Sequence, residues 1–465
     1  MSSPHPARPW LEPLRSAAWL SRDRVTAWSS ILFATELLII VFLALWQHGV
    51  FVPVPNPPSS DFASFYAAGK LAVAGTPALA YDHAAHWAAE QQATWAGAGY
   101  QYFFYPPVFL LVCAPLATLP YFVAYALFQI ATLALFLQAM RAVLQATGAQ
   151  RRGWQWLPPV LAFPAVFWTI GLGQNAFLTS ALFCGFTRLI DRRPARAGLL
   201  LGLLCYKPHF GLLVPVALIA GRRWRAFAAA AATVAALVGL SILLFGWSCW
   251  AAYLHAFAGS GAVYQSGAID FAGIETPFGT ALLMGIAPGA AYALQAAIAL
   301  AMVVLTVLVW RRCASHAIRC AILLAATLLA VPLALLYDKL LLLVAIAWLL
   351  GAAEDGGFLP WEKLVLLLVW PASVASWPVG AAWHVPLGLA TTVAVLALCL
   401  RRVWRAPVTA LSSETALSSE IALSPETALS PETAPSPETA LSPETAPRAW
   451  AAPNRDRSQT VGAMP

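Results

Sequence analysis

Ionisable side chains are scarce in this chain, and the few that lie among apolar segments are the candidates for chemistry. Among 465 residues, Asp occurs eight times and Lys only four times. Lys70 follows Asp61, and Lys207 lies in the tetrapeptide YKPH. Lys339 lies in the tripeptide YDK. Polar groups at membrane depth are costly and usually functional, so these segments indicate one polar site that is assembled from several parts of the chain.

Two further segments add polar and aromatic groups to this site. The tip GLGQN (171–175) carries an amide pair, and YQYFFYPP (100–107) supplies rings that are able to stack on a ligand. On the topology deduced below, all of these segments face the outer side of the membrane. The candidate residues are Asp61, Lys70, Tyr105, Gln174, Asn175, Lys207, His209, Asp338 and Lys339.

Each candidate also has a simpler explanation. A lysine at the end of a span often snorkels to the interface, and Gln or Asn at a tight tip often forms the turn. Asp82, in AYDHAAH, is expected to cap the helix that follows it. Convergence on one face, rather than any single residue, is what favours a functional site.

The composition identifies the environment of this site. The chain is 60% hydrophobic and 10% charged, with a mean hydropathy of +0.71, whereas soluble chains are about 45–50% apolar and about 25% charged. This excludes a soluble enzyme and indicates a polytopic membrane protein. The net charge of +7 does not indicate nucleic-acid binding, because the arginines form short clusters between apolar runs. The seven cysteines lack zinc-type or redox spacing.

The arginine clusters predict the topology, because basic residues in short loops mark the cytoplasmic side. The expected fold is an all-α bundle of about 11–13 transmembrane helices, although several apolar runs are shorter than a simple span. Residues 103–150 contain two apolar runs, and the sequence leaves open how many of them cross. The predicted regions are a cytoplasmic N-terminal segment (1–26), a transmembrane domain (27–405) with outward loops at 48–102 and 249–290, and a disordered cytoplasmic tail (406–465) with ALSPET repeats.

Four motifs follow one another in the first half of the chain. They are SDFASFYAAGKLAVAGTPALAYD (60–82), FFYPPVFLLVCAPLATLP (103–120), GLGQNAFL (171–178) and LLGLLCYKPHFGLLVPVALIAGRRWRA (200–226). Together with the later LYDKLLLL (336–343), this ordered series resembles glycosyltransferase family 87, whose members are mannosyltransferase-like membrane enzymes of the GT-C fold. Residues 227–330 and 350–400 are similar to the family only in hydropathy.

The resemblance implies a hexosyltransferase that takes a sugar, typically mannose, from a polyprenyl-phosphate donor to a lipid or glycan acceptor. The reaction would occur on the outer side of a bacterial plasma (inner) membrane, with inversion at the anomeric carbon. The family's catalytic carboxylate corresponds to Asp61, which would act as general base. Lys207, with His209 beside it, is expected to stabilise the leaving phosphate. Lys70 and Lys339 are further candidates for this role.

The remaining candidates are expected to bind sugar hydroxyls or to line the pocket: Tyr105, Gln174, Asn175 and Asp338. No cofactor is expected besides the lipid-linked donor, because the chain lacks a Rossmann glycine fingerprint. It also lacks an Asp-x-Asp pair, so no metal is predicted. An alternative class is a transporter or flippase of lipid-linked sugars, for which internal repeats are typical, and a third is a scaffolding membrane protein. Nothing in the sequence indicates an oligomeric state.

Overall fold

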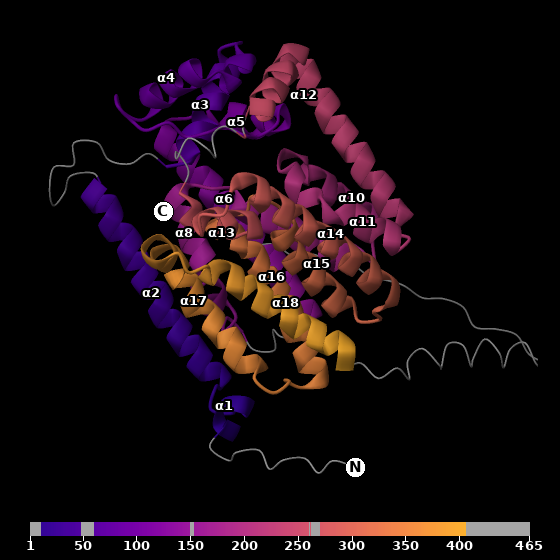
Figure 1. The fold of residues 1–465 in the computed structure, drawn as a ribbon. Coiled ribbons are helices and arrows are strands. Elements are labelled where there is room, and N and C mark those ends of the chain that lie inside the picture. The colour runs from indigo at the N-terminus through magenta and orange to yellow at the C-terminus, as the bar shows by residue number, and fades with distance from the viewer. Residues whose placement is uncertain (1–10, 48–59, 149–152, 260, 262–269, 406–465) are drawn as a thin grey trace, which may run out of the picture. The chain divides into compact units, whose positions relative to one another are not determined.

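The computed structural model of the chain describes residues 11–47, 60–148, 153–259, 261 and 270–405 (Figure 1). Every named element among these residues is a helix, and their one strand-type contact is an isolated antiparallel bridge between Ile274 and Leu335. The predicted tail lies outside the described residues, as do parts of both predicted outward loops. The all-α fold is confirmed for the described part of the chain.

Seven of the described helices are long and apolar enough to span a bilayer, which needs about 20 residues. They are α2 (Arg22–Gln47), α6 (Tyr121–Ala146), α12 (Trp224–Gly259), α14 (Pro288–Arg312), α16 (Leu340–Gly356), α17 (Glu362–Trp383) and α18 (Leu387–Arg405). Shorter apolar helices pack among them: α9 (Ala176–Leu189), α10 (Pro194–Gly202), α11 (Leu213–Ala220) and α15 (His316–Ala330). The chain is therefore a polytopic membrane protein, and how many of the shorter helices cross stays a prediction.

A layer of short helices lies at one end of the bundle (Figure 1). It consists of α3 (Phe62–Val73), α4 (His83–Ala93) and α5 (Leu110–Leu116), with the 3₁₀ turns η2 (Pro77–Tyr81) and η3 (Pro107–Phe109). Asp82 caps α4 as predicted, since its side chain accepts a hydrogen bond of 2.9 Å from the backbone N of Ala85. α5 has only seven residues and packs on α3. Of the two apolar runs in 103–150, only α6 is therefore long enough to cross a membrane.

The packing of α3 on α5 depends on Gly69. A Cβ atom at this position would lie 2.2 Å from the carbonyl oxygen of Cys113 and 2.8 Å from the Cβ of Ala117. Only glycine leaves room for such a close approach of two backbones. Gly69 therefore fixes the distance between α5 and the helix that begins directly after Asp61.

α16 is the most enclosed of the seven long helices. Its residues from Leu340 to Leu349 are all buried, and it packs against α15, α9, α6 and α18. A helix that is apolar all round is expected in such a central place. The turn η8 (Leu336–Lys339) leads directly into α16, so the YDK tripeptide lies at the start of the central helix.

Two tight connections bring distant segments towards α3. α8 (Pro164–Leu172) and α9 form a helical hairpin, and Gly173, in the GLGQN tip between them, has a φ of +70°. A Cβ atom on Gly173 would lie 2.7 Å from the Cβ of Phe62, so the tip touches the first turn of α3. After α10 the chain forms the 3₁₀ turns η4 (Leu203–Tyr206) and η5 (Pro208–Gly211), and Lys207 lies between them because Pro208 cannot continue a helix.

α12 is broken at Gly246, whose φ of 79° and ψ of 160° are not helical. Beyond this break the helix continues to Gly259. The predicted second outward loop, 249–290, therefore begins inside a helix and also contains α13 (Pro277–Leu283) before α14 starts.

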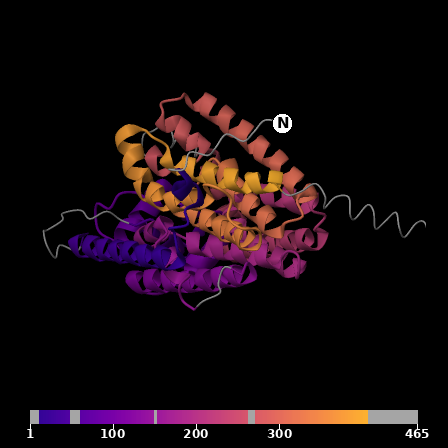
Figure 2. The same ribbon diagram turned by 90° about the horizontal axis from the view of Figure 1, so that it is seen from below.

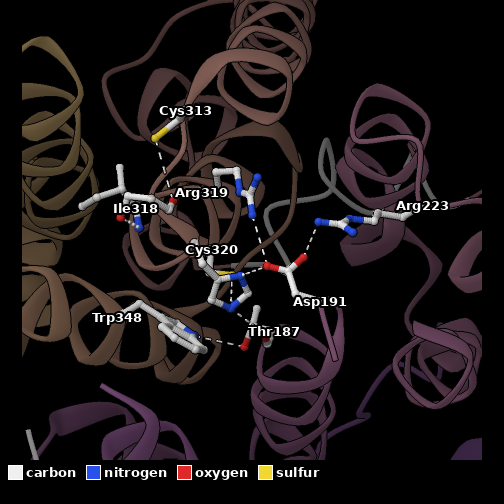
Figure 3. A network of polar contacts seen from close by, with 10 residues as sticks. Thr187, Asp191, Arg223, Cys313, Ile318, Arg319, Cys320 and Trp348 are labelled. Atoms are coloured by element: carbon white, nitrogen blue, oxygen red, sulfur yellow. Dashed lines mark hydrogen bonds and ion pairs between the residues drawn. The ribbon is translucent and has the colours of Figure 1, made fainter. Parts of the chain in front are cut away.

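Asp191 ties together the ends of three helices (Figure 3). It follows α9 and accepts bonds from Arg223 at 2.5 Å, from Arg319 at 3.2 Å and from Nδ1 of His316 at 2.7 Å. These partners lie next to the start of α12 and in the first turn of α15. The hydrogen bond with His316 and the charges of its cationic partners hold the pKa of Asp191 down at about 2, although partial burial acts in the opposite direction.

Candidate active site

Asp61 and Gln174 form the first contact between predicted site residues. Oδ2 of Asp61 accepts a hydrogen bond of 2.8 Å from Nε2 of Gln174, which lies 113 residues further along the chain. Within the described part of the chain, Oδ1 of Asp61 accepts no hydrogen bond. One carboxylate oxygen is therefore held in place, while the other is able to receive a proton.

Gln174 is itself held from several sides. Its Oε1 accepts a hydrogen bond from the Tyr105 hydroxyl and another from the backbone N of Asn175, both at 3.3 Å. Nε2 of Gln129 in α6 donates to the backbone carbonyl of Gln174 at 3.1 Å. Because the oxygen of the Gln174 amide is engaged on one side, its N–H group is directed at Asp61.

The Asn175 side chain is fully buried, yet neither its oxygen nor its nitrogen has a hydrogen-bond partner of normal geometry among the described residues. It lies beside the Tyr105 hydroxyl without reaching such geometry. A buried amide without partners costs about 1–3 kcal/mol. The position therefore suits a ligand that brings both donors and acceptors, as hydroxyl groups do.

Lys207 and Asp338 form a buried ion pair. Nζ of Lys207 lies 2.8 Å from Oδ1 of Asp338, and their side chains are only 4% and 3% exposed. Oδ2 of Asp338 accepts a hydrogen bond of 3.1 Å from the backbone N of Leu335. Both oxygens of Asp338 are therefore engaged, in contrast to those of Asp61. An ammonium group has three donors, so Lys207 retains donors for a ligand.

Electrostatic interactions join the Asp61 group and the Lys207 pair into one site. Burial raises the pKa of Asp61, whereas the hydrogen bond from Gln174 and the positive charge of Lys207 lower it. The pKa of Tyr105 is raised first by burial and then by the negative charges of Asp338 and Asp61, so the Tyr105 hydroxyl lies within the electrostatic range of both carboxylates. The predicted residues that the structure brings together are Asp61, Tyr105, Gln174, Asn175, Lys207 and Asp338.

Lys339 belongs to a different polar cluster. Its Nζ lies 3.0 Å from Oε2 of Glu275, and it donates to the Gly388 carbonyl and the Thr391 hydroxyl at the start of α18. Lys339 and Glu275 are both buried. The side chain of Lys339 is thus committed to a structural ion pair, although its neighbour Asp338 contributes to the site.

Lys70 and His209 are also not part of the hydrogen-bonded site. Lys70 is exposed in the last turn of α3, where its Nζ lies 5.3 Å from the ring centroid of Tyr66. His209 is half-buried and packs on the ring of Phe210. Among the described residues, neither side chain makes a hydrogen bond to Asp61, Gln174 or Asp338.

Several residues of the site and its surroundings were not predicted. Gln129 is a polar residue inside the apolar helix α6. Polar side chains are rare in apolar segments, and the argument that identified the lysines as candidates would also have identified Gln129. Tyr206, whose hydroxyl lies 2.8 Å from that of Thr179, is the first residue of the YKPH tetrapeptide. Glu275 is one of few carboxylates outside the tail, so a search for acids able to pair with each lysine would have found it.

No group of three or more His, Cys, Asp or Glu side chains is placed to hold a metal ion in the described ranges. The described site residues instead provide one carboxylate with a free oxygen, one ammonium group and several amide and hydroxyl groups. These groups are suited to acid–base chemistry and to the binding of an anion. A polytopic membrane protein with an enclosed site of this kind has the groups needed for a transfer reaction between polar substrates.

Residues 103–337, about half of the chain, match glycosyltransferase family 87. The chain therefore belongs to this family and is a glycosyltransferase. Comparison with curated proteins and with solved structures gives no significant match. The matched range contains Tyr105, Gln174, Asn175 and Lys207, while Asp61 precedes it.

Proposed function

We propose that this glycosyltransferase moves a hexose, with mannose as the first choice, from a polyprenyl-phosphate donor to a lipid or glycan acceptor. The observation that carries the proposal is the contrast between the two carboxylates. Asp61 keeps an oxygen without a hydrogen-bond partner in the described structure, whereas both oxygens of Asp338 are occupied. The site thus offers one general base and one carboxylate that positions a lysine.

The base step follows from the position of Asp61. The acceptor hydroxyl attacks the anomeric carbon of the sugar, the bond from that carbon to the phosphate oxygen breaks, and the hydroxyl proton passes to Oδ1 of Asp61. General-base catalysis of this kind contributes typically about 10²–10⁴-fold in rate. Gln174 holds the other carboxylate oxygen and so orients the free one.

The leaving group departs as a phosphate ester that is already ionised. Such a group needs positive charge and hydrogen-bond donors more than it needs a proton. Lys207 supplies both, and Asp338 fixes the position of its ammonium group. The proposal assigns the binding of sugar hydroxyls to Asn175 and Tyr105, which is supported by the buried, unpartnered amide of Asn175.

Inversion at the anomeric carbon is the expected stereochemistry. A retaining mechanism with a covalent intermediate uses a second carboxylate as nucleophile. Asp338 is the other carboxylate of the site, and its engagement with Lys207 and Leu335 leaves it poorly suited to attack.

We propose that no metal ion is obligatory and that Asp61 faces the outer side of a bacterial plasma membrane, with both termini in the cytoplasm.

The proposal is tested with the purified full chain, radiolabelled polyprenyl-phosphate-mannose and a membrane-lipid extract as acceptor. Asp61→Asn is expected to reduce kcat by about 10²–10⁴-fold with little change in the KM for the donor. Asp82→Asn is the matched control, because asparagine caps a helix about as well as aspartate and Asp82 caps α4 outside the site. Wild-type activity in Asp61→Asn would overturn the proposed mechanism.

The same protein distinguishes an enzyme from a flippase. A transferase forms a glycosidic product in detergent, where no membrane separates two compartments, whereas a flippase moves the intact donor across a vesicle membrane without forming a product. Donors that carry other hexoses, assayed in parallel, identify the sugar. Movement of intact donor without transfer under any donor or acceptor condition would favour the transporter class.

A further inference from the structure

A large cavity lies between helices at the Arg22 end of α2, away from Asp61. Its volume is about 720 Å³, which is within the range of binding sites for ligands of substantial size. Its walls come from α2, α6, α16 and α17, four of the seven helices that are able to span a membrane, and from the short helix α7 (Leu157–Leu161). The cavity therefore lies among membrane-embedded helices, where lipids are the abundant ligands.

Like a phospholipid, the lining of the cavity has a large apolar part and a smaller charged part. Most of it is apolar, with leucines from α16 and α17. Its charged groups are Arg22 at the start of α2, Glu354 near the end of α16 and Lys363 at the start of α17. Tryptophans favour the headgroup level of a bilayer, and three of them line the same cavity: Trp28, Trp156 and Trp370.

The charged end of the cavity has an excess of positive charge. Arg22 is paired with Glu354 at 2.5 Å. The Nζ of Lys363 lies 4.9 Å from the ring centroid of Phe358, and no described carboxylate forms an ion pair with it. Two cations and one anion leave a net charge of +1, which favours an anionic ligand.

This cavity is separate from the candidate active site. Asp338 lies directly before α16, and Glu354 lies near its other end. At 1.5 Å per residue, the stretch of α16 from Leu340 to Glu354 alone spans about 21 Å, which is most of the roughly 30 Å thickness of the hydrocarbon core. A ligand held at Lys363 is therefore at the opposite side of the membrane from one held at Lys207.

We propose that this cavity binds one anionic phospholipid, with its phosphate at Arg22 and Lys363 and its acyl chains between α2 and the bundle. The lipid fills a space that α2 leaves open, because α2 lies at the edge of the bundle in both views (Figures 1 and 2) and its main contacts are with the short helices α7 (Leu157–Leu161) and α8. It thereby holds the helix that precedes Asp61 in its place. This lipid is neither donor nor acceptor of the transfer reaction.

The test uses the purified full chain in a neutral detergent, titrated with phosphatidylglycerol or with phosphatidylcholine, and follows the thermal unfolding midpoint. Phosphatidylglycerol is expected to raise the midpoint saturably and at lower concentration than phosphatidylcholine. Lys363→Gln is expected to shift the phosphatidylglycerol titration to about five-fold higher concentration, since one basic side chain contributes about that factor near an anionic lipid. Arg24→Gln is the matched control, because it removes the same charge from exposed α2 surface outside the cavity.

A second pair of variants addresses the acyl-chain part of the cavity. Ser29 lines it, whereas Ser30 is exposed and does not. Ser29→Phe fills part of the cavity and is expected to remove the saturable response and to reduce the phospholipid that copurifies, measured by mass spectrometry, while Ser30→Phe leaves both unchanged. Equal responses to the two lipids would overturn the proposal. It would equally be overturned by equal losses in Lys363→Gln and Arg24→Gln, or by a wild-type lipid content in Ser29→Phe.

Discussion

At the scale of single residues, the site depends on how each charged group is neutralised. Lys207 and Asp338 satisfy each other in a buried pair, and removing one partner of such a pair typically costs about 3–5 kcal/mol. Asp61 has no comparable cation within hydrogen-bond distance, and its only described side-chain partner is the neutral amide of Gln174. This leaves its charge less stabilised, which suits the general-base role that we propose for it.

The pH dependence of the reaction should therefore respond to Gln174. The base is active when ionised, so activity rises with pH through the pKa of Asp61. Burial raises this pKa and the Gln174 hydrogen bond lowers it. In Gln174→Leu the lowering contribution is lost, so the acid limb of the kcat/KM profile is expected to move to higher pH.

The control for this experiment is Gln138→Leu, which changes an exposed glutamine of α6 outside the site. Its profile should coincide with that of the wild type. An unchanged acid limb in Gln174→Leu, in a protein that still unfolds cooperatively, would contradict the role given to the Asp61–Gln174 bond.

The sequence identified those site residues whose type is rare in an apolar chain. Asp61, Lys207 and Asp338 stand out by charge, and Gln174 stands out by its position at a tight tip. Lys339 has the same appearance, yet it pairs with Glu275. Such pairing depends on the distances between segments in three dimensions, and hydropathy and composition do not predict these distances.

At the scale of helices, apolar length predicts which segments are able to span a membrane, but it does not predict how the shorter apolar segments pack. The runs at α5 and α6 are similar in hydropathy, and only the structure shows that α5 is short and packs on α3 in the layer of short helices. The break of α12 at Gly246 is a second example, because the surrounding sequence continues as an apolar helix on both sides.

The contact between α3 and α5 is expected to control the position of Asp61. Gly69→Ala places a methyl group where Cys113 O lies 2.2 Å away, so the two helices must separate. Overpacking of this kind costs about 1–3 kcal/mol. A lower unfolding temperature and a reduced kcat are expected, and Gly99→Ala, where nothing lies within 4 Å of the new atom, is the control. Equal behaviour of both variants would show that this contact does not position the base.

The Asp191 network should make the packing of α9, α12 and α15 sensitive to acid. The pKa of Asp191 is about 2 in the folded chain, below its ordinary value of 3.8. The ionised form therefore stabilises the fold above pH 3.8, and this contribution is lost as the pH falls towards 2. Asp191→Asn should lower the unfolding temperature at neutral pH, and its difference from the wild type should shrink on acidification.

Asp355→Asn, which removes an exposed carboxylate at the end of α16, is the control for general charge effects. It should remain close to the wild type at both pH values. A difference between Asp191→Asn and the wild type that is the same at neutral and acid pH would assign the effect to packing rather than to the charge of Asp191.

At the scale of the whole molecule, different groups of charged residues lie at the two ends of α16. Asp338 and the Asp61 site lie at the start of this helix, whereas Glu354, Arg22 and Lys363 lie around its far end. Arginine clusters follow the same division, since Arg401 and Arg402 at the end of α18 bond to Pro360, Ala352 and Glu362 near the far end. Basic residues concentrate on the cytoplasmic side, so we expect the Asp61 site to face the outer side.

This orientation is tested by labelling single introduced cysteines in intact cells with a reagent that does not cross membranes. Ala74→Cys lies at the exposed end of α3, and Arg192→Cys lies in the exposed turn after α9. Ala74→Cys is expected to react from outside the cell, and Arg192→Cys only after permeabilisation. The native cysteines give a low background, because five of the seven are buried. Labelling of both positions from the same side would contradict the proposed orientation, because Ala74 follows α3 beside the Asp61 site and Arg192 lies at the other end of α9 from Gln174.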